Sequence, residues 1–83
     1  MSALRPLSEL NPGDHAVIAA VHAPEDLGKR LTALGFSVGR PLRLVRRALL
    51  AGPLHVRLGT TDVALRMAEA AGVQVRLAAP GTA

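Results

Sequence analysis

The sequence has no cysteine, no tryptophan and no tyrosine, and its one phenylalanine is Phe36. Without cysteine the chain can form neither a disulfide nor a thiolate metal site, and it has no cysteine nucleophile. Stability must therefore come from packing, for which the hydrophobic fraction of 49% is sufficient. A chain of 83 residues is expected to form one small domain around a single aliphatic core.

Long apolar runs are absent too. No stretch approaches the roughly 18 residues that a membrane span needs. No basic N-terminal segment leads into an apolar stretch of the kind that marks a secreted protein. These two absences predict a soluble protein of the cytoplasm.

Acidic residues are missing from the middle of the chain, although the formal net charge is only +4. Between Leu27 and Thr61 there is no Asp or Glu, and the basic residues are Lys29, Arg30, Arg40, Arg43, Arg46, Arg47 and Arg57. This basic window fits a solvated face, a nucleic-acid surface or a surface for an acidic protein partner. Small barrels that bind single strands use aromatic side chains for base stacking, which this composition nearly lacks.

Catalytic motifs are also missing. The sequence contains no G-x-S-x-G, no G-x-x-x-x-G-K-[ST], no G-x-G-x-x-G after a strand and no H-E-x-x-H. We therefore expect a non-enzymatic protein without a cofactor. His15, His22 and His55 are the candidates for metal ligands, but none of them has i,i+4 spacing, and three exposed imidazoles are the simpler interpretation.

The ends of the chain lack any periodic pattern. We predict flexible segments at residues 1–6 and 78–83 and one ordered domain at residues 7–77. Near the start of this domain, LSELNPGD predicts a tight turn. The β-branched and small residues of HAVIAAV predict a strand over residues 15–21.

The sequence PEDLGKRLTALG predicts a helix over residues 24–35. Pro24 suits the first helical position, and Gly35 suits a left-handed helix end. Leucines recur on one face of this helix. Two acid–base pairs at i,i+4 spacing should each add about 0.2–0.5 kcal/mol: Glu25 with Lys29, and Asp26 with Arg30.

After residue 40, apolar residues alternate with polar ones, which is typical of strands. Three alternating segments, at 41–48, 54–58 and 62–66, predict a meander. One helical turn at 67–72 and a last strand at 73–77, with Val73, Val75 and Leu77 inward, complete the pattern. This order predicts a mainly β fold: a small SH3-like barrel of about five strands, with one helix after the first strand and a helical turn before the last. A five-stranded OB-type barrel is the alternative, but its helix usually lies between the third and fourth strands.

The connection between the first two meander strands, ALLAGPL, is unusually apolar. Consecutive leucines would be exposed there unless the loop folds back over the barrel or a partner covers it. An apolar centre with an arginine rim is typical of a protein-binding patch. We therefore predict partner-binding residues at Leu49, Leu50, Arg46, Arg47 and Arg57, with Lys29 and Arg30 of the helix as flanking contacts.

Three segments together carry a resemblance to a known family: LSELNPGD, KRLTALGFSVG at 29–39, and VRRALLAGPLHVRLGTTDVALRMAEAAGVQV at 45–75. In order and spacing they are similar to the FeoA family, small cytoplasmic proteins of bacterial ferrous iron uptake. The resemblance implies an SH3-like fold and an accessory role with the transporter FeoB, whose cytoplasmic GTP-binding domain is the expected partner.

The same module also resembles the C-terminal SH3-like domain of iron-dependent repressors of the diphtheria-toxin-repressor type. In those proteins it accompanies a winged-helix domain and a metal-binding region, which this sequence does not contain, so the transport interpretation is favoured. A basic barrel for nucleic acid remains the alternative function. Open strand edges and the apolar loop are also compatible with a homo-oligomer.

Overall fold

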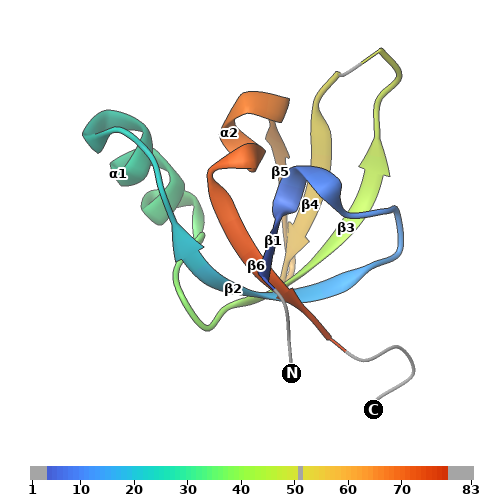
Figure 1. The fold of residues 1–83 in the computed structure, drawn as a ribbon, viewed down its shortest axis with the longest axis horizontal. Helices are drawn as coiled ribbons and strands as arrows, with labels where there is room; N and C mark the ends of the chain where they lie inside the picture. The colour runs from blue at the N-terminus through green and yellow to red at the C-terminus, as the bar shows by residue number, and fades with distance from the viewer. Residues whose placement is uncertain (1–3, 51, 79–83) are drawn as a thin grey trace.

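A computed structural model describes residues 4–50 and 52–78 of the chain. Strands and helices follow one another as the sequence predicts, with one strand added at the start (Figure 1). The elements in chain order are β1 (Leu4–Pro6), the 3-10 helix η1 (Leu7–Glu9), β2 (His15–Val21), α1 (Glu25–Leu34), β3 (Pro41–Arg47), β4 (Leu54–Leu58), β5 (Thr61–Leu65), α2 (Met67–Ala71) and β6 (Val73–Leu77).

The strands form one antiparallel sheet in the order β1-β6-β2-β3-β4-β5. The mainly β class and the β3–β4–β5 meander are thus confirmed. Figure 1 shows the sheet strongly curved, with α1 at one side of the molecule and the β3–β4 hairpin at the other. Within the described ranges, neither helix is long and apolar enough to cross a membrane.

The core lies on the concave side of the sheet and is aliphatic except for Phe36, as the composition predicts. Alternate positions of β2 to β6 supply it, which is why the period-two pattern could predict the strands after residue 40. Its largest fully buried side chains are Phe36, Leu7, Leu10, Ile18, Leu31, Leu44, Leu54, Leu58, Leu65, Val56, Val73 and Val75.

The N-terminal segment differs from the prediction of a flexible end. Leu4–Pro6 forms β1, which pairs with β6. Three residues are too few to show an alternating pattern, and the strand depends on a partner strand near the other end of the chain. At that other end, the backbone N–H of Ala78 donates to the carbonyl of His15 at 2.8 Å. The rest of the two predicted flexible segments, residues 1–3 and 79–83, lies outside the described residues.

Three local details also depart from the sequence pattern. Pro24 is the residue before the helix, not its first residue, whereas Gly35 ends α1 in the left-handed region, with φ 105°, as predicted. The LSELNPGD segment contains η1 ahead of its turn. Leu77 is 39% exposed instead of inward, because it is the last residue of β6.

Candidate functional site: the β3–β4 hairpin and its groove

The connection between β3 and β4 carries the most exposed large apolar side chains of the described chain. Leu49 is 89% exposed and Leu50 is fully exposed. The backbone N–H of Ala48 donates to the carbonyl of Pro53 at 3.1 Å, so the strands stay paired up to the loop. We call the described residues 48–50, 52 and 53 the hairpin tip. The hairpin tip does not fold back over the core, so the two leucines are open to contact.

Leu50 has a backbone conformation that leucine rarely adopts. Its φ is 58°, in the left-handed region, and it is the one non-glycine residue there in the described chain. The side chain of an L-residue crowds its own backbone in this region, at a cost of about 1–2 kcal/mol. A fully exposed leucine gives no packing energy in return. The position is typical of strain retained for a function outside the fold.

A β-bulge in β3 precedes the two arginines next to the hairpin tip and sets the face of the sheet on which each one lies. The register with β4 shifts between Leu44 and Arg46, so the strict alternation of β3 breaks. Arg46 lies opposite His55 on the outer face of the sheet, and it forms no ion pair among the described residues. Arg47 lies opposite the buried Leu54 instead.

Arg47 is a half-buried connector between β3 and the η1 segment. Its Nη2 donates to the carbonyl of Ser8 and, at 2.7 Å, to the carbonyl of Leu10. These two bonds hold the segment before β2 against the end of β3. The sequence grouped Arg46 and Arg47 as partner-binding residues, but the bulge gives Arg47 contacts within the domain.

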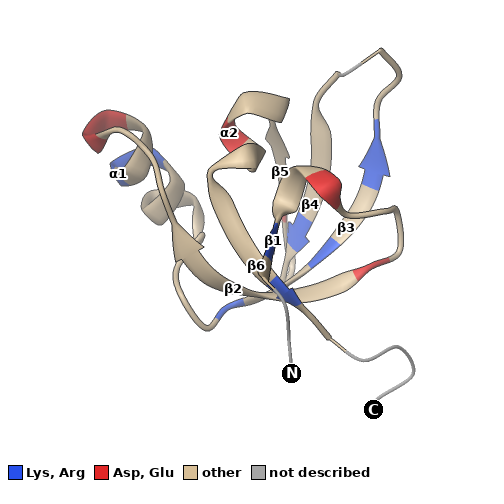
Figure 2. Ribbon diagram, viewed as in Figure 1, with Lys and Arg blue, Asp and Glu red and all other residues tan. Residues whose placement is uncertain are grey.

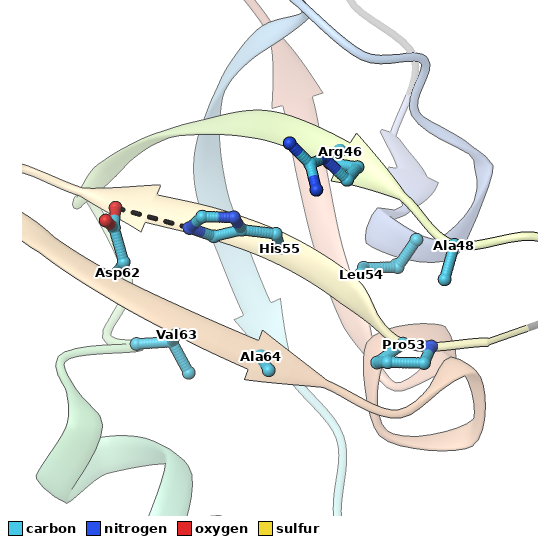
Figure 3. Close-up of a pocket in the computed structure, with 8 residues that line it drawn as sticks. All are labelled: Arg46, Ala48, Pro53, Leu54, His55, Asp62, Val63 and Ala64. Atoms are coloured by element: carbon cyan, nitrogen blue, oxygen red, sulfur yellow. Dashed lines mark ion pairs between the residues drawn. The ribbon is translucent and has the colours of Figure 1, made fainter.

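Arg57 is the third arginine of the predicted patch, and it pairs with Asp62 of β5. Its Nε donates to Asp62 Oδ1 at 2.8 Å, and Nη2 lies 3.4 Å from Oδ2. This hydrogen bond raises the pKa of Arg57 and lowers the pKa of Asp62 from their ordinary values. His55 Nε2 lies 3.5 Å from Asp62 Oδ1 (Figure 3). Asp62 thus partly neutralises this end of the outer face.

A groove runs from the hairpin tip along the outer face of β4 and β5 (Figure 3). Its volume is about 350 Å³. The walls are mostly apolar, with Arg46 on one side and His55 and Asp62 at the far end. The lining residues are Arg46, Ala48, Pro53, Leu54, His55, Asp62, Val63 and Ala64.

The two cations of α1 lie away from the hairpin tip and are paired. Lys29 Nζ is 3.3 Å from Glu25 Oε1, as predicted. Arg30 does not pair with Asp26 as the i,i+4 spacing predicted, because its Nη2 reaches Glu69 of α2 at 3.2 Å. Figure 2 shows this mixture of charges around α1 and α2, in contrast to β3, on which every charged residue is basic.

The three histidines are spread over the sheet. His15 begins β2, His22 follows it, and His55 lies on β4. In the part of the chain that is described, no three His, Cys, Asp or Glu side chains come together in a way that could hold a metal ion.

Sequence reasoning missed Asp62 and the β5 side of the groove. The segment at 62–66 predicts only an alternating strand, so Asp62, Val63 and Ala64 were not predicted as site residues. The available signal was the two-residue turn before β5, which places Asp62 directly opposite Arg57 across the hairpin.

The family comparison covers almost all of this fold. Residues 5–77 match the FeoA domain model. A fusion protein of Porphyromonas gingivalis, Fe(2+) transport protein A/Fe(2+) transporter FeoB, is 38% identical over 71 residues, which are 86% of this chain but 8% of the fusion protein. A candidate Fe(2+) transport protein A of Campylobacter jejuni is 34% identical over the same share of this chain and 96% of its own length.

Solved structures agree with this match. FeoA of Stenotrophomonas maltophilia, described as a unique prokaryotic SH3 domain protein and solved with zinc, is 38% identical with a TM-score of 0.73, covering 90% of this chain and 88% of that one. A manganese-dependent transcriptional repressor shares the fold alone, with 23% identity and a TM-score of 0.85 over 94% of this chain and 44% of its own. The SH3-like fold predicted from the sequence is therefore confirmed, and the chain belongs to the FeoA family of ferrous iron transport.

Proposed function

We propose that this chain is a non-enzymatic accessory protein that binds the cytoplasmic GTP-binding region of a FeoB transporter through its hairpin tip. Membership of the FeoA family supports the link to ferrous iron transport. The Porphyromonas gingivalis relative supports the choice of partner, because it joins Fe(2+) transport protein A and FeoB in one chain. On this proposal the protein works in the cytoplasm and modulates the assembly or nucleotide-linked gating of the transporter.

The observation that carries the proposal is the pair of exposed leucines at the hairpin tip. Burying one leucine side chain contributes about 1.5–3 kcal/mol, and the buried centre of a protein interface is more apolar than its rim. Arg46, at the base of the hairpin, adds a cation that no acidic side chain of the described chain neutralises. The combination fits a partner surface with an apolar hollow and an acidic rim.

The test is calorimetric titration of the protein into the isolated GTP-binding domain of the cognate transporter, with and without a GTP analogue. We expect Leu50→Asp to weaken binding at least tenfold, because it places a carboxylate in the apolar centre. Val38→Asp is the matched control. Val38 is 69% exposed and belongs to the α1–β3 connection. Figure 1 shows this connection on the side of the molecule away from the β3–β4 hairpin.

Both variants lower the net charge by one, so a general charge effect would weaken the binding of both to the same extent. A Leu50→Asp variant that keeps its melting temperature and binds like the wild type would contradict the proposed surface. Titration at two salt concentrations separates the contribution of Arg46. Arg46→Gln should lose part of the salt dependence of the wild type, since screening acts on the charge contacts and not on the leucines.

Nucleic acid is not favoured as the partner. Phe36, the only aromatic residue, is 1% exposed, so no aromatic ring is available for base stacking. A fluorescence anisotropy titration with mixed RNA and DNA at low salt should stay flat.

A further inference from the structure

The two edges of the sheet differ in how they are protected. At one edge, β1 has only three residues, and one of them is Pro6, which cannot donate a backbone hydrogen bond. At the other edge, β5 has five residues, Thr61–Leu65, without proline or lysine, and its register with β4 is continuous. Short length, proline, lysine and bulges are the usual devices that stop an edge from pairing with another chain. β5 has none of these four, and its one charged side chain, Asp62, is paired with Arg57.

β5 also presents unused backbone groups. It follows a two-residue turn in which Gly59 has φ 62°, and Leu58 and Thr61 flank this turn as Cα partners. The residues that flank such a turn form a hydrogen-bonded pair, and bonded pairs then alternate along the ladder. The N–H and C=O groups of Asp62 and Ala64 therefore point away from β4. Among the described residues, only β4 makes backbone hydrogen bonds to β5.

The groove is lined on one side by this edge strand. Ala64 and the backbone next to the core residue Val63 line it on the β5 side, and Arg46 of β3 lies across it (Figure 3). Ala64 is the outward-facing residue next to the edge, and its small side chain leaves the groove open from the side. A segment pairing with β5 would thus have a lateral entrance to a cavity that contains an unpaired cation.

We propose that β5 accepts an extended, acidic segment of a partner protein as a seventh strand, with one carboxylate laid over Ala64 toward Arg46. Main-chain bonds to Asp62 and Ala64 would supply the affinity, and the groove would select the side chain. Adjacent strands lie about 4.8 Å apart, so the added strand is about 14 Å from the backbone of β3. Both side chains would extend over the groove between them, where their opposite charges attract. The inference goes beyond the proposed function and does not depend on the identity of the transporter.

A second copy of the chain is the less suitable occupant. Each copy carries a net charge of +4, and pairing β5 with β5 would bring two outer faces of the same sign together. An acidic segment removes this repulsion and gives Arg46 its missing partner.

The probe is a capped seven-residue peptide of alternating glutamate and valine, titrated into the 15N-labelled protein and followed by NMR. We expect the amides of Asp62 and Ala64 to shift and, at saturation, to exchange at least tenfold more slowly. A peptide with lysine in place of glutamate is the control for charge, and it should bind at least tenfold more weakly. Arg46→Gln should remove most of the difference between the two peptides.

Ala64→Pro should weaken the acidic peptide at least tenfold, because proline removes the outward N–H and leaves the bonds to β4 intact. Ala64→Ser, which is small and keeps the N–H, is the matched control. Absence of binding, equal binding of both peptides, or unchanged exchange at Asp62 and Ala64 would each overturn the inference, even if Ala64→Pro does not fold. A wild-type dimer in sedimentation velocity that Ala64→Pro dissociates would assign the edge to a second copy instead. Loss of transporter binding in Leu50→Asp tests the proposed function separately.

Discussion

The helical side of the molecule and the β3–β4 hairpin use their cations in opposite ways. On the helical side, Lys29 pairs within α1 and Arg30 pairs with Glu69 of α2. The same Glu69 accepts the backbone N–H of Arg66 at 2.9 Å, so one carboxylate both begins α2 and ties it to α1. At the hairpin, Arg46 has no acidic partner in the described chain, and two leucines are exposed beside it.

This difference separates fold from function within a uniformly basic window. Ion pairs on the helical side lower the local charge, and they occupy the Lys29 and Arg30 hydrogen-bond donors that a partner would need. The hairpin keeps both its charge and its apolar surface available. The proposed interface is therefore centred on Arg46, Leu49 and Leu50. Lys29 and Arg30 mainly make contacts within the domain.

The largest expected effect on stability comes from a comparison of two leucines, one on the helical side and one at the hairpin. Leu31 is the one fully buried residue of α1, and Leu49 is 89% exposed. Leu31→Ala should lower the free energy of unfolding by about 2–5 kcal/mol, because it removes apolar contacts and leaves a cavity. Leu49→Ala should change it by less than about 0.5 kcal/mol but weaken binding to the transporter domain. Urea unfolding and calorimetric titration of the two variants provide the measurements, and equal stability losses would contradict the division.

A smaller effect concerns the carboxylate that links the two helices. Glu69 has a side chain only 12% exposed. Glu69→Ala should cost about 1–2 kcal/mol in unfolding free energy, since it removes both the acceptor at the start of α2 and the partner of Arg30. Glu69→Gln keeps an acceptor oxygen and should cost less.

The control for Glu69 is Glu25→Gln. It breaks the pair with Lys29, in which both side chains are mostly exposed, and should cost less than about 0.5 kcal/mol. Thermal melts of the three variants rank them. If Glu25→Gln and Glu69→Ala cost the same, Glu69 does not connect the helices in the way described.

Much of this fold could be predicted because its signals are local. Alternation predicted β3, β4, β5 and β6, a run of β-branched and small residues predicted β2, and the glycine after the leucine stripe predicted the end of α1. The connection with the two leucines was recognised as a candidate surface for the same reason. Whether it folded back or stayed exposed depended on the rest of the chain, and only the structure decided it.

The features that the sequence did not reveal depend on distant partners. β1 exists because β6 pairs with it. The bulge after Leu44 changes the face of every later residue of β3, so Arg47 turns toward Ser8 and Leu10. Arg30 had Asp26 at ideal helical spacing but found Glu69 on another helix. In each case a contact between residues that are distant in the sequence took precedence over the local pattern.

A small gain in stability gives the sharpest contrast between fold and function. Leu50→Gly should raise the free energy of unfolding by about 0.5–1 kcal/mol, because glycine adopts φ 58° without strain while its own chain entropy offsets part of the gain. The same change should weaken binding to the transporter domain at least tenfold, since it deletes an apolar contact. Chemical unfolding and calorimetric titration measure the two quantities on one protein. A variant that is more stable and binds equally well would leave the strain at Leu50 without a function. A variant that is more stable but binds more weakly would indicate that this leucine is retained for a partner.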